Sequence, residues 1–156
     1  MIRYRPNVAF ILRRADGRIL IGERSDVGGA WQFPQGGVDK KESPEEALRR
    51  EVLEEISLAP SDYRVTEQRG PYRYEYSDGR TKEGCGGQEQ IYFLADFLGD
   101  EAQILSQPST IEFQAVRWIE PADFRLEWVH PMKQEVYRAV FRDFFNVELP
   151  SVQEIA

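Results

Sequence analysis

The stretch of sequence that decides the fold is residues 36–58, which reads GGVDKKESPEEALRREVLEEISL. Its middle part predicts the start of a helix. Ser43 suits the N-cap, Pro44 suits the first helical position, and Glu46 stands where a capping box is completed. We expect this helix to continue to about Ile56.

The predicted helix carries glutamates beside an apolar stripe. The stripe consists of three aliphatic residues spaced four apart: Leu48, Val52 and Ile56. At roughly 100° per residue, Glu55 lies closest to this stripe, Glu51 lies next to it, and Glu54 points furthest outward. Glu51 and Glu55 repel each other across neighbouring turns, and a divalent cation between them would reverse that interaction. A solvated acidic face is the alternative that the residue types leave open.

Apolar runs outside this helix predict strands and one further helix. The runs 8–12 and 19–21 flank Asp16-Gly17 and predict a hairpin. Other strands are expected over 31–34, ending in a tight turn at Gly36-Gly37; over 63–76, broken in two at Gly70-Pro71; over 88–97; and over 115–119. An amphipathic helix is expected from Met132, with core positions at Val136, Val140, Phe141, Phe144 and Phe145. This order predicts a single α/β domain over 1–156, with a mixed sheet and helices packed against it.

The net charge and its distribution along the chain limit the kinds of ligand that the protein is expected to bind. The chain has 156 residues and a net charge of −7, which argues against a broad groove that follows a nucleic acid backbone. Residues 1–24 nevertheless contain six arginines and only two acidic residues. An anion could therefore be recognised locally there, with a solvated strand face as the alternative.

Cysteine and histidine each occur once, as Cys85 and His130. A single cysteine excludes an internal disulfide, and a single histidine excludes a histidine-rich zinc site and argues against a Ser-His-Asp triad. A metal would be held by oxygen ligands, which favours magnesium or manganese. No apolar stretch approaches the roughly 18 residues that span a bilayer. We therefore expect a cytoplasmic protein with no membrane partner, and a homodimer remains open.

The spacing of Gly36, Glu42 and the run 50–58 resembles the signature of the Nudix hydrolases. That signature is Gly, five residues, Glu, seven residues, then Arg-Glu-aliphatic-x-Glu-Glu-x-Gly-aliphatic. The resemblance implies the Nudix fold, an α/β/α sandwich with a mixed sheet between helices. Every defined position agrees except Ser57, which stands where the family has glycine. A left-handed serine at a helix end should cost about 1 kcal/mol, affecting stability more than chemistry.

The resemblance also implies roles for individual residues. The implied metal ligands are the carbonyl of Gly36 and the carboxylates of Glu51, Glu54, Glu55 and Glu112. Arg50 is implied to orient these carboxylates, whereas Glu42 looks structural. Magnesium, with manganese as the alternative, would polarise the phosphoryl oxygens and activate a water for in-line attack. The expected catalytic residues are Arg50, Glu54, Glu55 and Glu112, and the general base remains open among the three glutamates.

The segment 31–37, WQFPQGG, resembles the bacterial RNA pyrophosphohydrolases and the related dinucleoside polyphosphate hydrolases. By position, this resemblance implies substrate contacts from four side chains: Arg5, Arg24, Gln35 and Lys133. An ordinary surface charge is the alternative for Arg5 and Lys133.

Three functions follow from these observations as hypotheses. The first is removal of pyrophosphate from the 5′ end of triphosphorylated RNA, with hydrolysis of diadenosine polyphosphates as a side activity. The second is hydrolysis of nucleoside triphosphates, including oxidised guanine nucleotides. The third is a binding module without turnover, which would predict a damaged glutamate set. The segment 31–37 favours the first hypothesis, and the intact set of Arg50, Glu51, Glu54 and Glu55 argues against the third.

Overall fold

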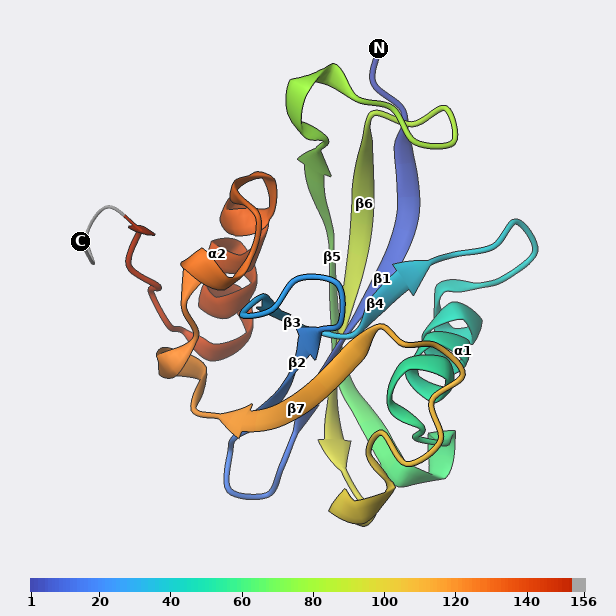
Figure 1. The fold of residues 1–156 in the computed structure, drawn as a ribbon, viewed down its shortest axis with the longest axis vertical. Helices are drawn as coiled ribbons and strands as arrows, with labels where there is room; N and C mark the ends of the chain where they lie inside the picture. Colours follow the sequence, from blue (N-terminus) through green and yellow to red (C-terminus); the bar gives the residue numbers. More distant parts are fainter. Residues whose placement is uncertain (153–156) are drawn as a thin grey trace.

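The computed structural model describes residues 1–152, apart from the side chain of Asp78, and shows a mixed sheet between two helices (Figure 1). The strands are β1 (Tyr4–Arg13), β2 (Ile19–Arg24), β3 (Trp31–Gln32), β4 (Gln35–Gly37), β5 (Tyr63–Glu75), β6 (Gly87–Phe97) and β7 (Phe113–Ile119). The helices are α1 (Pro44–Ile56) and α2 (Pro131–Phe145), and short 3₁₀ turns occur at Pro60–Asp62, Ser77–Gly79, Glu101–Gln103, Pro121–Asp123 and Leu126–Trp128. Because α1 and α2 lie on opposite sides of the sheet in Figure 1, the predicted α/β/α layers are confirmed.

Strand β1 forms the centre of the sheet. The order is β3-β2-β1-β6-β5, with β4 paired to β1 and β7 paired to β2. β1 and β6 run parallel, whereas the other pairs are antiparallel. Asn7 on β1 is paired with Gly37 on one side and with Gln90 on the other. This register brings β4 and β6 to opposite edges of the same part of β1.

The side chains of β1 alternate between two buried cores. Val8, Phe10 and Leu12 pack in the cluster that contains the apolar stripe of α1. Ala9 and Ile11 pack in the cluster beneath α2. Since both faces of β1 are covered, its apolar run is continuous, as expected for a strand buried on both sides.

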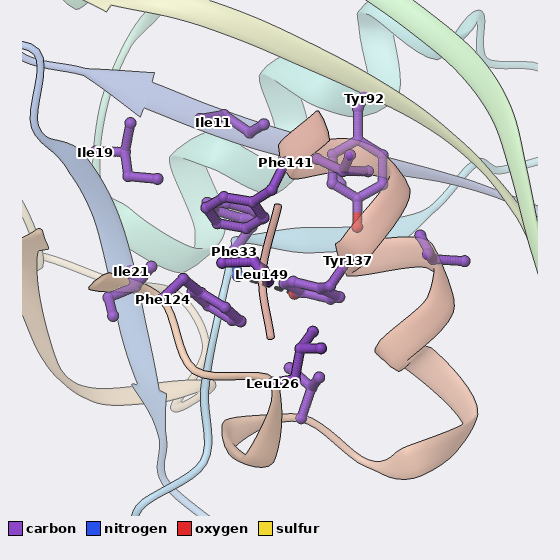
Figure 2. Packing of buried hydrophobic residues seen from close by; sticks show 14 of the residues in the cluster. Ile11, Ile19, Ile21, Phe33, Tyr92, Phe124, Leu126, Tyr137, Phe141 and Leu149 are labelled. Carbon is purple, nitrogen blue, oxygen red and sulfur yellow. Dashed lines mark hydrogen bonds between the residues drawn. The ribbon is translucent and has the colours of Figure 1, made fainter. Parts of the chain in front are cut away.

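Helix α2 covers a core rich in aromatic rings. Phe33 is fully buried there, and its ring stacks on Tyr137 at 5.5 Å and on Phe141 at 5.7 Å between centroids (Figure 2). The core role predicted for Phe141 is confirmed, and Phe144 and Phe145 pack against this core while partly buried. Within the described residues, neither helix is long and apolar enough to cross a membrane.

The N-terminus of α1 has the predicted capping box. The Ser43 hydroxyl accepts a hydrogen bond from the backbone N–H of Glu46 at 3.1 Å, and the Glu46 carboxylate accepts the N–H of Ser43 at 3.0 Å. The helix ends at Ser57, whose φ of 69° and ψ of 21° are left-handed. The hydroxyl of Ser57 also accepts the backbone N–H of Gln107 at 2.9 Å. Serine therefore contributes a tertiary contact that glycine cannot make.

Two substitutions at Ser57 separate these opposing effects. Ser57→Ala is expected to lower the free energy of unfolding by about 1 kcal/mol, because the Gln107 N–H loses its acceptor. Ser57→Gly should stay within about 0.5 kcal/mol of the native protein, since relief of the left-handed strain offsets the lost bond. Urea unfolding of both variants and of the native protein measures these changes in the free energy of unfolding. A gain of more than about 1 kcal/mol for Ser57→Gly would show that the hydroxyl contributes nothing.

Two local predictions were wrong. Gly36 and Gly37 lie in strand β4 rather than in a tight turn, because they pair with Val8 and Asn7 of β1. The expected break at Gly70-Pro71 is also absent, since β5 is one strand over Tyr63–Glu75. Its register against β6 shifts between Val65 and Glu67 and between Arg69 and Tyr72, so irregularities in the pairing accommodate the proline.

Candidate active and metal-binding site

Helix α1 presents its glutamates at three depths. Glu55 is buried, with 3% of its surface exposed. The side chain of Glu51 is 15% exposed and that of Glu54 is 34% exposed. The order of shelter predicted from helical angles is confirmed, because the apolar stripe of α1 faces the sheet and draws its nearest neighbours inward.

Strand β4 lies directly against these carboxylates. The backbone N–H of Gln35 donates to Glu55 Oε1 at 3.4 Å. A methyl group added at Gly36 would overlap the carboxyl group of Glu51. The glycine therefore permits a close approach between strand and helix, and its backbone borders the two most sheltered glutamates.

Arg50 connects the start of the signature to its end. Its guanidinium donates to both oxygens of Glu42, at 2.7 and 2.8 Å, and to Glu51 Oε1 at 2.8 Å. It also donates to the carbonyl of Gly37 at 2.9 Å and to Glu54 Oε2 at 3.4 Å. The arginine thereby links the loop before α1, strand β4 and two of the candidate ligands.

Glu42 fits the structural role expected for it. Its carboxylate binds Arg50 through two parallel hydrogen bonds and accepts the backbone N–H of Asp39 at 2.9 Å. These interactions, led by Arg50, lower the pKa of Glu42 to about 2. Glu42 thus stays ionised and fixes the arginine, and its own oxygens are occupied.

Negative charge converges on Glu55. Burial raises the pKa of Glu55 well above its ordinary value, and a hydrogen bond with Glu51 and the charges of Glu51 and Glu112 raise it further. Glu112 lies just before β7, so the fold brings a carboxylate from 57 positions further along the chain into electrostatic contact with α1. A buried, mutually repelling carboxylate set of this kind is complementary to a divalent cation.

The side chains do not yet form a closed coordination group. Within residues 1–152, no three acidic, histidine or cysteine side chains are arranged to hold a metal ion. Arg50 binds Oε1 of Glu51 and Oε2 of Glu54, so one oxygen of each carboxylate already has a partner. The donor set is nonetheless all oxygen and suits a hard divalent cation.

Two of the predicted substrate residues line one pocket. Arg24 and Lys133 border a cavity of about 340 Å³ between the segments 24–32 and 127–133. Arg24 is held by Asp26, with its Nη2 at 2.6 Å from Oδ2. Burial lowers the pKa of Lys133 to about 8, the nearby Arg24 lowers it too, and Glu112 partly opposes them. The pocket thus brings two basic side chains together beside Glu127, and its Lys133 is electrostatically coupled to Glu112.

The other two predicted substrate residues lie at β4: Gln35 is its first residue, and Arg5 on β1 lies against its last. The guanidinium of Arg5 lies against Gly37, where an added methyl group would overlap it, and its Nε is 3.3 Å from Glu83 Oε2. The side chain of Gln35 turns into the sheet, where its Oε1 accepts a hydrogen bond from Gln90 Nε2 at 2.7 Å. Arg5 and Arg24 therefore approach the site from different strands.

Sequence reasoning missed four buried polar residues of the sheet. Asn7, Gln32, Gln88 and Gln90 are each less than a tenth exposed. Polar residues at inward positions of otherwise apolar strands were the available signal, in particular the Gln-x-Gln spacing at 88–90. The ring of Trp31 is covered by the guanidinium of Arg117, whose Cζ is 4.6 Å from the ring centroid.

The chain is similar to known proteins along nearly its whole length. The profile of the NUDIX domain matches residues 3–143. Proteins named RNA pyrophosphohydrolase from Yersinia pestis (strain Pestoides F) and Yersinia pseudotuberculosis serotype O:1b are 36% identical over 159 residues, covering 98% of this chain and 89% of theirs. Among solved structures, the E. coli dihydroneopterin triphosphate pyrophosphohydrolase has a TM-score of 0.65 at 19% identity, covering 90% of this chain and 96% of its own. A binary complex of the C. elegans Ap4A hydrolase has a TM-score of 0.62 at 20% identity, covering 90% and 99%. These structural likenesses show a shared fold.

Proposed function

The chain belongs to the Nudix hydrolase family and is a pyrophosphohydrolase, and we propose that its main substrate is RNA with a 5′-triphosphate. The enzyme would release pyrophosphate and leave a 5′-monophosphate end. Diadenosine polyphosphates would be a second substrate, because they also present a polyphosphate joined to a nucleoside. The observation that carries the proposal is the pair of buried Glu55 and half-buried Glu51 against the β4 backbone, with the cationic residues Arg5, Arg24 and Lys133 nearby.

Nudix hydrolases generally use divalent metal ions, and we propose Mg²⁺ here, with Mn²⁺ able to replace it. The carbonyl of Gly36 and the carboxylates of Glu51, Glu54, Glu55 and Glu112 would hold it. When bound, the metal supplies Lewis-acid polarisation of the phosphoryl oxygens and a more acidic water. The residues fit this role because repulsion around Glu55 is relieved by positive charge.

The protein's own residues supply orientation and proton transfer. Arg50 holds Glu51 and Glu54 at the edge of the site and is itself fixed by Glu42. Glu54, Glu55 and Glu112 are the candidates for accepting the proton of the attacking water. On the substrate side, Arg5, Arg24 and Lys133 would bind phosphate oxygens, and Gln35 would add a polar contact.

A direct comparison of substrates tests the proposal. The purified protein with Mg²⁺ is incubated in parallel with 5′-triphosphate RNA, diadenosine tetraphosphate and 8-oxo-dGTP, and kcat/KM is measured for each. We expect the RNA to be the best substrate and Glu55→Gln to be inactive on all three. A preference for 8-oxo-dGTP of more than about 100-fold would replace the RNA assignment with nucleotide cleansing.

Lys133 gives the substrate site a testable dependence on pH. Because the pKa of Lys133 is lowered to about 8, its ammonium is charged below that pH and neutral above it. We expect KM for triphosphorylated RNA to rise as pH increases through this range. Lys133→Arg keeps its charge throughout, so KM in that variant should not show the rise. Identical pH profiles of KM in the two proteins would show that Lys133 does not bind the phosphates.

A further inference from the structure

A buried line of amide and hydroxyl groups runs beneath the candidate site. Gln90 lies at its centre, with 2% of its surface exposed. Its Nε2 donates to Asn7 Oδ1 at 2.9 Å and to Gln35 Oε1 at 2.7 Å. The hydroxyl of Tyr92 donates to Gln90 Oε1 at 3.4 Å. Both hydrogens and the oxygen of this amide therefore have partners.

The position of Gln90 makes these bonds non-local. Gln90 is on β6 and Asn7 is its partner on the neighbouring strand β1. Gln35 is on β4, which pairs with the opposite edge of β1. The Gln90 side chain thus reaches across the central strand and ties two strands that do not pair with each other.

A buried amide at position 90 is less favourable than an aliphatic side chain of the same size unless its polar atoms are hydrogen-bonded. Burying an amide group without partners is unfavourable, whereas an aliphatic side chain has no such penalty. Gln90 has an aromatic neighbour at position 92 and apolar residues at 93–95 on the same strand. The amide group of Gln90 is explained by its hydrogen bonds to Asn7 and Gln35.

The residue that Gln90 binds lies directly at the site. The backbone N–H of Gln35 donates to Glu55, and the next residue, Gly36, lies against Glu51. Strand β4 has only three residues, so few ladder bonds hold it. A second tie is nearby, where the buried Tyr137 hydroxyl accepts the backbone N–H of Phe33 at 3.2 Å. The segment 33–36 is therefore held from within the core on both sides of Pro34.

We propose that Gln90 is a positioning residue of the candidate active site, which holds Gln35 and through it the backbone that faces Glu55 and Glu51. This inference rests on the proposed function of that site. Gln90 is buried under the site and acts through Gln35. Loss of its bond should displace the β4 backbone by a fraction of an ångström, so it should lower kcat more than it changes KM.

Gln90→Met keeps the length of the side chain and removes its hydrogen bonds. We expect kcat on 5′-triphosphate RNA to fall by about 10- to 100-fold with KM unchanged within about threefold. Tyr72→Phe is the matched control. Tyr72 lies on β5 and pairs with Gln90 of β6, but the Tyr72 hydroxyl donates to Asp143 of α2 at 2.8 Å and not to β4. That variant should stay within about twofold of the native kcat.

A double variant separates positioning from general damage. If Gln90 acts through Gln35, Gln35→Met/Gln90→Met should have the kcat of the slower single variant. Multiplying losses would show that Gln90 acts by another route and would overturn the proposal. A native kcat in Gln90→Met would overturn it as well.

Amide hydrogen exchange provides a readout that needs neither metal nor turnover. Exchange at Gln35 and Gly36, followed by NMR, should be about tenfold faster in Gln90→Met and unchanged in Tyr72→Phe. If Gln90→Met does not fold, Gln35→Met breaks the same bond from its half-buried end, and exchange at Gly36 should rise in the same way. Unchanged exchange at Gly36 contradicts the proposal. If the native protein fails to hydrolyse RNA, the proposed function fails, and the exchange result still decides whether Gln90 holds β4.

Discussion

Glu55→Gln is expected to lower kcat by about 10³-fold while making the metal-free protein more stable at neutral pH. Activity falls because the substitution removes the most sheltered carboxylate of the site, which lies between Glu51, Glu112 and the backbone of Gln35. Stability rises because glutamine has nearly the same shape as glutamate but is uncharged, so no ionisable group has to be buried away from water. Opposite changes in activity and stability are typical of a residue retained for function.

The stability effect has a defined sign and pH range. Burial and neighbouring carboxylates raise the pKa of Glu55 above its unfolded value, so the folded state retains a proton that the unfolded state releases. Stability from this group is present below the unfolded pKa, about 4.5, and is lost as pH rises from there towards the folded pKa. The slope is roughly 1.4 kcal/mol per pH unit for one proton. Glu55→Gln should abolish this part of the slope.

Urea unfolding in the presence of a chelator between pH 5 and 8, together with RNA hydrolysis at saturating Mg²⁺, measures both effects. Glu45→Gln is the matched control, because Glu45 is exposed in the first turn of the same helix. It should leave kcat unchanged and stability within about 0.5 kcal/mol. Native hydrolysis rates in Glu55→Gln would show that the catalytic site lies elsewhere.

Arg50→Ala is expected to have the largest effect on stability, a loss of about 2–4 kcal/mol, with kcat lowered by at least about 100-fold. The arginine neutralises Glu42 and Glu51, whose side chains are 18% and 15% exposed. Without it, both carboxylates remain near each other and partly out of water. The expected loss of unfolding free energy is smaller than for a fully buried ion pair, because the carboxylates of Glu42 and Glu51 remain partly exposed to solvent.

Two neighbouring substitutions test whether the fork geometry of Arg50 matters. Arg50→Lys keeps the charge but cannot bind both oxygens of Glu42 and also reach Glu51, so we expect it to recover less than half of the lost stability. Arg49→Ala removes an exposed arginine from the adjacent position of α1 and should have little effect. Equal losses in Arg49→Ala and Arg50→Ala would contradict the role of Arg50 as a specific link.

Much of the helix that carries the site could be predicted from local sequence. The capping box of Ser43 and Glu46 and the ranking of Glu55, Glu51 and Glu54 by shelter are confirmed. Each depends on residues at most eight positions apart within or just before one helix, so helical geometry alone decides it. The strand registers could not be predicted in this way. The expected turn at Gly36-Gly37 was wrong because these residues pair with Val8 and Asn7 of β1, which lie 28 and 30 positions away in the chain.

The class of chemistry can be inferred from local sequence, because the spacing from Gly36 to Leu58 places an arginine and three glutamates on one side of a capped helix. The groups that contact them depend on the three-dimensional fold. Pairing of β4 with β1 brings the Gly36 backbone against Glu51, the loop before β7 brings Glu112 within electrostatic reach of Glu55, and Gln90 reaches Gln35 across β1. These contacts join residues far apart in the chain, and strand register and core packing set them, which no local pattern encodes.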